Sequence, residues 1–330
     1  MATVAAGCSG GDSADLSGGG GREPTTTVPK FFPLTGLQAT DAAGAANAAR
    51  PAVTVKIENS RASRPQAGLD VADIVFEAVV EGGQTRFLAV FQSTDADPVG
   101  PIRSVRPSDP AVVAPFGGIV AYSGGIQRFV DAMRATGLEN FDEDNAGDAF
   151  VRRSDRSAPH NLYTSTSSLH DKASDGSPPS KFAEFLPPGQ AFAPPGAVPV
   201  TQITLVVGRT TTAGYQWDPA SSTWARSTDG QLHTAESGAQ IAPTTVIVQY
   251  VPYESTGEVD TTGAPVSEAK VVGSGDAVIF ASGVMVNARW SKPNASSMTT
   301  WTDVNGAPIS LPAGRTWVEM PAAGAALTTA

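Results

Sequence analysis

One stretch constrains the fold of this chain more than any other: residues 77–125, EAVVEGGQTRFLAVFQSTDADPVGPIRSVRPSDPAVVAPFGGIVAYSGG. It reads as a strand, a glycine turn, a second strand, an arginine-rich loop, a helix and a third strand. In open α/β sheets, ligands bind beyond the strand ends, because the backbone there is unpaired and the loops aim side chains inward. The stretch therefore predicts a pocket at these strand ends, and we expect the rest of the chain to be built around it.

The chain before residue 190 mixes strand and helix patterns. Val53, Val55 and Ile57 alternate with polar residues, which is typical of a strand. Further strands are expected at residues 73–80, 86–91 and 119–122. Helices are expected from Ser108 onward, at residues 128–136 and, as a polar helix, at residues 167–182. This first part is therefore predicted to be a mixed α/β domain.

After a proline-rich crossing at residues 186–200, the chain has a β pattern. Its short apolar runs are separated by Gly, Asn, Asp and Pro turns, which favours a small antiparallel sandwich or barrel. The expected strands lie at residues 203–207, 214–217, 222–226, 244–250, 269–272, 276–280, 284–290 and 316–320. Five tryptophans are expected in the core of this part rather than on a sugar-binding platform: Trp217, Trp224, Trp290, Trp301 and Trp317.

The predicted fold class is therefore α+β. We expect a tether at residues 1–33, an N-terminal mixed α/β domain at 34–190 that carries the site, and a smaller, mostly antiparallel β domain at 191–330.

The composition excludes several classes of protein. The formal net charge of −10 argues against a nucleic-acid partner, because neutralising phosphates requires a basic face. No apolar run approaches the length of a membrane-spanning helix. A single cysteine rules out a disulfide within the chain and a zinc site with paired thiolates. Zinc-binding histidine spacings and a phosphate-binding glycine loop are also missing, so no metal and no cofactor is predicted.

The single cysteine, Cys8, follows Ala5-Ala6-Gly7, which is similar to the lipobox that ends a bacterial lipoprotein signal peptide. A glycine-rich segment follows, as in a flexible tether. Seven residues are too few for a signal peptide, so either the true start lies upstream of Met1 or the sequence has been trimmed. The pattern predicts a lipid anchor on Cys8, at the extracytoplasmic face of the cell membrane. The alternative is a free cysteine in a tail.

Arginines at strand ends predict an anion site. Arg86 follows the glycine turn, and Arg103 and Arg106 lie in the loop after the second strand. A planar guanidinium group can grip a carboxylate or a phosphate at two points. The candidate ligand-binding residues are Arg86, Arg103, Ser104, Arg106, Ser123, Asn161 and Tyr163. In the alternative interpretation, which is compatible with the first, carboxylates pair with these arginines and brace the loops; the candidates are Glu58, Glu77 and Glu81.

Glu81 and His160 are the candidates for acid–base chemistry. Histidine titrates near neutrality, and partial burial can raise the pKa of a glutamate until it serves as a proton donor. His160 follows a proline that stiffens its loop; the alternative role is a structural hydrogen bond. The other two histidines, His170 and His233, are expected to be structural.

Short motifs carry a resemblance to a known family. In the first part they are PLTGL at 33–37, KIEN at 56–59, RPQ at 64–66, VEGG at 80–83, VGPIRS at 99–104, YSGG at 122–125 and HNLY at 160–163. In the second part they are IVQY at 247–250, ARW at 288–290 and GRTW at 314–317. Together they resemble the YerB-like lipoprotein family, a domain of unknown function with an N-terminal and a C-terminal part. The resemblance implies a bacterial, membrane-anchored envelope lipoprotein with an α/β first part, and it implies no reaction and no catalytic residue.

Two functions remain open. The first, which we expect, is a lipoprotein that binds an anionic envelope polymer or another envelope protein in an arginine-lined cleft. The alternative is an enzyme that cleaves a cell-wall glycan, as a hydrolase or a lyase, with Glu81 and His160 as acid and base. We expect Arg103→Ala to weaken ligand retention more than Arg226→Ala, because Arg226 is predicted to lie in a surface turn of the second domain.

Overall fold

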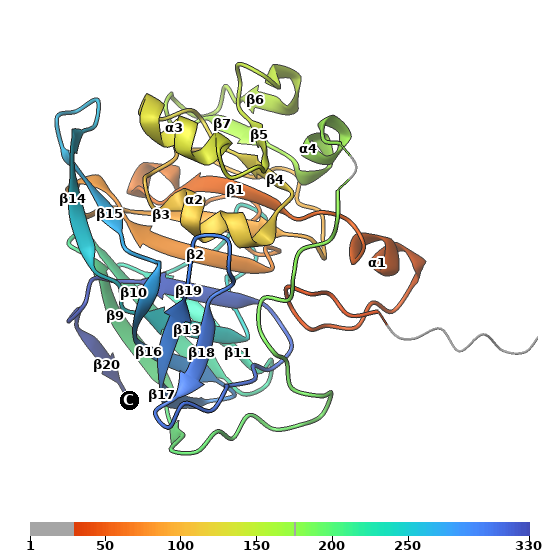
Figure 1. Ribbon diagram of the computed structural model, residues 1–330, viewed down its shortest axis with the longest axis vertical. Coiled ribbons are helices and arrows are strands. Elements are labelled where there is room, and N and C mark those ends of the chain that lie inside the picture. The colour runs from red at the N-terminus through yellow and green to blue at the C-terminus, as the bar shows by residue number, and fades with distance from the viewer. Residues whose placement is uncertain (1–29, 175) are drawn as a thin grey trace, which may run out of the picture.

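The structure is a computed structural model that describes residues 30–174 and 176–330. Cys8, with the lipid anchor predicted on it, lies outside the described residues. One large sheet organises the described part of the chain, and its strands come from both the beginning and the end of the sequence (Figure 1).

This 11-stranded sheet has the order β18-β17-β16-β13-β19-β2-β3-β1-β4-β5, with β8 paired to β17. Its early strands are β1 (Val53–Glu58), β2 (Ile74–Val79), β3 (Thr85–Phe91), β4 (Ile119–Ala121) and β5 (Glu139–Phe141). Its late strands are β8 (Val198–Pro199), β13 (Thr245–Gln249), β16 (Gly273–Ala281), β17 (Val284–Lys292), β18 (Thr300–Asp303) and β19 (Thr316–Met320). The two sets meet where β19 runs parallel to β2, with Glu319 beside Glu77. Strands from both sides of residue 190 thus share one sheet.

A second sheet covers one face of the first. It has five strands in the order β12-β11-β10-β9-β20. Their bounds are β9 (Gln202–Gly208), β10 (Thr211–Asp218), β11 (Thr223–Thr228), β12 (Gln231–Leu232) and β20 (Leu327–Thr329). Trp224 of β11 packs edge-on against Phe280 of β16, with ring centroids 6.0 Å apart. Two hairpins complete the strands, β6 (Phe150–Arg152) with β7 (Leu162–Thr164) and β14 (Tyr253–Val259) with β15 (Pro265–Ala269).

Two helices, α2 (Asp109–Val113) and α3 (Gln127–Arg134), cover the opposite face, whereas Leu169 of the fourth helix packs into the core on the side of the second sheet. The helices are α1 (Ala42–Asn47), α2 (Asp109–Val113), α3 (Gln127–Arg134) and α4 (Thr166–Lys172), with short 3-10 turns η1 (Arg61–Ser63), η2 (Glu81–Gly83), η3 (Ala114–Phe116) and η4 (Gly147–Ala149). Figure 1 shows α2 and α3 on the same side of the large sheet. Phe116 of η3 packs on Phe76 of β2, with ring centroids 5.9 Å apart.

Because both faces are covered, the central strands have no exposed side. β1 alternates as predicted, but its polar residues Thr54, Lys56 and Glu58 are buried as well. Transferring a charged side chain from water into the core without a partner costs several kcal/mol. Buried charges therefore require partners. The charged residues of this face are therefore held in ion pairs, and these pairs build the site described below.

The predicted α+β class is confirmed: the described chain is mostly sheet with few helices. The core prediction for the tryptophans also agrees with the structure, since Trp224, Trp290, Trp301 and Trp317 are buried and Trp217 is half-buried.

The polar helix predicted at residues 167–182 is wrong in its length, because α4 ends at Lys172. Beyond it, the Ser174 N–H donates to the Glu139 carboxylate at 2.9 Å, and Pro178 and Pro179 have no N–H to continue a helix.

Candidate functional site

Two arginines from separate elements meet at Glu81, which lies in η2 directly after β2. Arg106 comes from the loop between β3 and α2, and its Nε lies 2.5 Å from Glu81 Oε1. Arg86 comes from β3, and its Nη2 lies 3.9 Å from Glu81 Oε2. All three side chains are largely buried. Glu81 therefore sits between two guanidinium groups.

Glu58, at the end of β1, extends this cluster toward solvent. Its Oε1 lies 3.6 Å from Arg103 Nε, and its Oε2 lies 2.8 Å from His160 Nδ1. The side chain of Glu58 is only 5% exposed, whereas those of Arg103 and His160 are 22% and 27% exposed. We call Glu58, Glu81, Arg86, Arg103 and Arg106 the arginine group; it reaches solvent beside Arg103 and His160.

Strand pairing and loop hydrogen bonds position these side chains. β1 and β3 are antiparallel, and their register places Glu58 opposite Arg86. The Arg103 N–H donates to the carbonyl of Lys56, and the Glu58 N–H donates to the carbonyl of Pro101, each at 2.9 Å. The arginine-rich loop therefore runs along the end of β1, as the strand-end argument from the sequence predicts.

A buried ion pair supports the arginine group from below. Lys56 Nζ lies 2.7 Å from Asp109 Oδ1 at the start of α2, and both side chains are buried. The other oxygen of Asp109 accepts from the Arg106 N–H at 2.7 Å. Burial lowers the pKa of Lys56, and the contact with Asp109 opposes this effect. This pair fixes the start of α2 and the turn that carries Arg106.

Positive charge is crowded within the arginine group. Burial, and then the neighbouring charges of Arg106 and Arg103, lower the pKa of Arg86 to about 10. Arg103 Nε, Arg106 Nε and both oxygens of Glu81 are buried and make no aligned hydrogen bond within the described structure. The short Arg106–Glu81 contact is therefore an ion pair without a well-directed hydrogen bond. These groups retain hydrogen-bonding capacity that a ligand could use.

The two predicted serines contact the group through their backbone. The carbonyl of Ser104 accepts from Arg86 Nη1 at 3.3 Å. The Ser123 N–H donates to the carbonyl of Arg103 at 3.1 Å. Both residues thus lie beside the arginine group, where they hold the loop.

Asn161 and Tyr163 contact a different set of residues. Asn161 donates to the carbonyl of Arg153 at 3.2 Å, and it accepts from Arg152 at 3.1 Å. The guanidinium group of Arg153 lies 4.7 Å from the centre of the Tyr163 ring. Burial raises the pKa of Tyr163 to about 12. The structure therefore brings these two residues to the β6–β7 hairpin, although His160 of the same segment reaches Glu58.

The prediction that Arg226 lies in a surface turn is wrong. Arg226 is fully buried in β11 and pairs with Glu77, and its Nη2 also lies 3.5 Å from Glu319 Oε1. Burial alternates along β11, so Arg226 points inward on the same face as Trp224. His233, expected to be structural, accepts a hydrogen bond at its Nδ1 from the guanidinium group of this arginine, at 2.6 Å. The period-two pattern around Trp224 is the sequence signal that could have placed Arg226 in the core.

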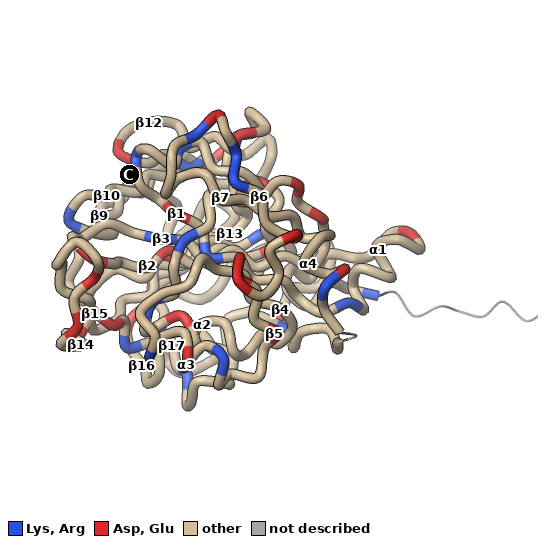
Figure 2. Tube along the Cα trace, turned by 90° about the horizontal axis from the view of Figure 1, so that it is seen from above, with Lys and Arg blue, Asp and Glu red and all other residues tan. Residues whose placement is uncertain are grey.

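Two cavities lie away from the arginine group. One of about 460 Å³ is lined mainly by phenylalanines and prolines, including Phe31 and Phe185, and one of about 380 Å³ is acidic, with Asp70 and Asp97 in its lining. Figure 2 shows Lys and Arg positions interspersed with Asp and Glu positions over the whole trace. The basic character of the arginine group is therefore local.

Residues 30–174 and 176–330 lack two further features. These residues contain no group of three His, Cys, Asp or Glu side chains arranged to hold a metal ion. No helix among them is long and apolar enough to cross a bilayer.

The fold and the site define a class: an α+β protein whose two sequence parts share one sheet, with ion-paired arginines at the strand ends of the first part. The family model "Protein of unknown function (DUF3048) N-terminal domain" matches residues 34–178, and the model of the corresponding C-terminal domain matches residues 203–318. The chain belongs to this family, which confirms the resemblance seen in its motifs.

A relative and a solved structure agree with this assignment. The chain is 27% identical to "Putative lipoprotein YerB" of Bacillus subtilis (strain 168) over 307 residues, which is 90% of this chain and 88% of that protein. It also matches the crystal structure of YerB protein from Bacillus subtilis with a TM-score of 0.75 at 23% identity, over 90% of this chain and 99% of that one. The structural likeness shows a shared fold.

Proposed function

We propose that this protein is a lipid-anchored lipoprotein of the extracytoplasmic membrane face that binds an anionic envelope ligand at the arginine group. The observation that carries the proposal is the crowding of Arg86, Arg103 and Arg106 around two carboxylates, with buried donor atoms left without an aligned acceptor. A ligand phosphate or carboxylate would accept from such donors in charge-assisted hydrogen bonds.

The two carboxylates of the arginine group are compatible with anion binding. Glu58 and Glu81 neutralise the arginines in the absence of ligand and hold their side chains in place. Arg103 is the accessible member, since its side chain is 22% exposed and its contact to Glu58 is 3.6 Å long. We therefore expect an incoming anion to bind Arg103 first and to share it with Glu58.

Two observations support the proposed lipid anchor. The sequence before Cys8 is similar to a lipobox, and the relative in Bacillus subtilis is named as a lipoprotein. Lipidation of Cys8 would hold the folded part near the membrane.

The test of binding uses the chain of 330 residues carrying Cys8→Ser, so that it is produced without lipid. Its co-sedimentation with purified cell walls is measured over a range of NaCl concentrations. Arg103→Ala removes charge-assisted hydrogen bonds to the ligand that are worth about 1.5–3 kcal/mol. The affinity of the protein for cell walls at low salt is therefore expected to fall at least about tenfold.

The matched control is Arg289→Ala, which removes an arginine that is 56% exposed and paired with Asp276 at 2.7 Å in the second part. It replaces Arg226, whose buried position makes it unsuitable. Equal effects of Arg103→Ala and Arg289→Ala would remove the assignment of the site to the arginine group.

One observation supports the enzymatic alternative. His160 is oriented by a carboxylate through its Nδ1, at 2.8 Å from Glu58, and is partly exposed, as in a histidine prepared for proton transfer. Glu81 pairs with Arg106 instead. Incubation of the protein with purified walls, followed by assay of soluble fragments, tests this reading: fragments released by the wild type and not by Glu81→Gln or His160→Gln would favour a wall-cleaving enzyme.

A further inference from the structure

An apolar groove lies at the surface, where the first described segment meets the loop that follows α4. Its lining comes from residues 31–48 and residues 178–188, and Figure 1 shows these two segments beside each other. The Phe182 N–H donates to the carbonyl of Pro33 at 2.9 Å, and the ring of Phe185 packs against Gly36. The groove has a volume of about 460 Å³, which is within the range of sites that bind small molecules.

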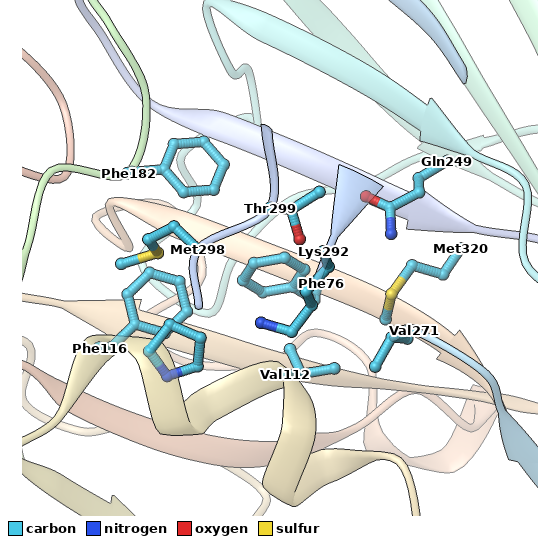
Figure 3. Close-up of a pocket in the computed structure, with 11 residues that line it drawn as sticks. Phe76, Val112, Phe116, Phe182, Gln249, Val271, Lys292, Met298, Thr299 and Met320 are labelled. Carbon is cyan, nitrogen blue, oxygen red and sulfur yellow. The ribbon is translucent and has the colours of Figure 1, made fainter. Parts of the chain in front are cut away.

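The core of the protein is packed much more tightly than this groove. Figure 3 shows a core cavity lined by Phe76, Phe116 and Met320, among others. That cavity has a volume of about 20 Å³, which is room for about one water molecule. The groove is therefore a local feature of the surface rather than a sign of loose packing.

The lining offers a ligand almost no hydrogen-bond donors. It contains five prolines, which have no N–H: Pro33, Pro178, Pro179, Pro187 and Pro188. Four further lining residues already donate their N–H to carbonyls of the chain: Phe32, Gly36, Ala48 and Leu186. Among the lining residues of the described structure, Lys181 alone has a side chain that can donate. A peptide would lose hydrogen bonds to water here without replacing them, whereas a hydrocarbon chain has none to lose.

Positive charge lies at the rim of the groove. The side chain of Lys181 is 67% exposed, and its ion pair with Glu184 is 3.5 Å long. Lys30, which is also exposed, directly precedes Phe31 of the lining. The rim can therefore hold an anionic headgroup while the groove holds an apolar chain.

The position of the groove indicates which apolar chains it meets. The described structure starts at Lys30, beside Phe31, so the segment that carries Cys8 joins the fold at this groove. We propose that the groove binds one acyl chain of an anionic membrane phospholipid, whose phosphate lies at Lys181. The choice of a membrane lipid as the source rests on the lipid anchor proposed for Cys8, whereas the preference for an acyl chain rests on the lining alone.

The experiment titrates the chain of 330 residues carrying Cys8→Ser with lysophosphatidylglycerol, below its micellar concentration, in a calorimeter. Acyl chains of eight, ten and twelve carbons are compared. We expect one bound lipid per protein and an affinity that rises about fourfold with each methylene taken out of water. Binding that does not saturate, an affinity independent of chain length, or tighter binding of a proline-rich peptide would overturn the proposal.

Matched variants locate the lipid on the protein. Phe31 is 46% exposed, so Phe31→Asp places a charge in the wall of the groove at a position that the fold tolerates. It should weaken lipid binding at least about tenfold. Leu232→Asp makes the same kind of change at a 73% exposed leucine of β12 and should bind like the parent. Equal effects of these two substitutions would contradict the assignment to the groove.

A third variant tests the headgroup contact. Lys181→Glu should weaken binding of lysophosphatidylglycerol about fivefold, as expected for an exposed ion pair, and leave binding of a neutral monoacylglycerol with the same chain unchanged. An unchanged affinity for lysophosphatidylglycerol would remove Lys181 from the site.

Arg103→Ala separates this groove from the arginine group. It should reduce binding to cell walls and leave binding of lysophosphatidylglycerol unchanged. Loss of lipid binding in Arg103→Ala, but not in Phe31→Asp, would place the lipid at the arginine group and refute a groove site. Because the titrated protein carries no lipid on Cys8, the result does not depend on whether the anchor forms.

Discussion

Replacing Glu319 by glutamine is expected to stabilise the protein at neutral pH, whereas Arg226→Met is expected to destabilise it. Glu319 and Glu77 lie side by side on parallel strands, and both face Arg226. One buried cation can neutralise only one of two buried carboxylates. Burial, followed by the charge of Glu77, raises the pKa of Glu319 well above its usual value. Glu319 is therefore the protonated member of the pair.

The structure favours glutamine as a mimic of this neutral acid. The Tyr215 hydroxyl donates to Glu319 Oε1 at 2.5 Å, and the amide oxygen of a glutamine can accept that bond. Its NH₂ group can donate to Glu77 in place of the acid proton. In contrast, Arg226→Met leaves the ionised Glu77 buried without its cation, which typically costs about 3–5 kcal/mol.

The pH dependence gives the size of the effect at Glu319. Because the pKa is raised in the folded state, the folded protein keeps a proton that the unfolded chain loses above about pH 4.3. The wild type therefore loses about 1.4 kcal/mol of stability per pH unit from this group as pH rises toward the folded pKa. The glutamine variant has no such slope, so at pH 6.5 it should be more stable than the wild type by about 3 kcal/mol.

Guanidinium chloride unfolding, followed by tryptophan fluorescence at pH 4.5, 5.5 and 6.5, measures these differences. Trp317 is a suitable reporter, because the Arg226 guanidinium lies 4.5 Å from its ring centre. The surface variant Arg289→Ala serves as the control for a lost exposed pair, which should cost less than about 1 kcal/mol. If stability of the Glu319→Gln variant runs parallel to that of the wild type across this range, Glu319 is ionised in the fold and the reasoning fails.

Two further predictions concern the support of the site. Asp109→Asn leaves buried Lys56 without its carboxylate and should reduce the free energy of unfolding by about 3–5 kcal/mol in a urea titration, more than Lys56→Met does. Tyr163→Phe removes a buried hydroxyl that has no hydrogen-bond partner in the described structure, so its melting temperature should equal or exceed that of the wild type; a drop of several degrees would show that the hydroxyl is bonded.

The sequence predicts those elements of the fold that have a clear local pattern. The alternation in β1 and the tight turns around β2 and β3 identify these strands within a residue or two. β14 was missed, because YESTGEV is polar and carries a glycine, and its strand form depends on pairing with β15. Pairing of distant segments is also what joins β19 to β2, and no local pattern encodes that contact.

The site was predictable in part for the same reason. Strand ends and the arginine-rich loop indicated that Arg86, Arg103 and Arg106 converge near Glu81. The structure places Arg86 and Arg106 at Glu81, whereas Arg103 pairs with Glu58. The role of Glu58 as the link from Arg103 to His160 depends on how residues about 100 positions apart come together, which only the folded chain shows. Carboxylate bracing of the arginines, the alternative considered from the sequence, is present at both Glu58 and Glu81.

The two sequence parts act as one unit at the site, because the buried network and the arginine group share strand ends. Glu77 accepts hydrogen bonds from Asn59 at 2.9 Å and from Thr85 at 2.6 Å, and Arg226 pairs with its other oxygen. Asn59 directly follows Glu58, and Thr85 directly precedes Arg86. An arginine from the second part thereby fixes the backbone on both sides of the arginine group, through a carboxylate of the first. The geometry at Arg103 is therefore set partly by residues more than 100 positions away in the chain.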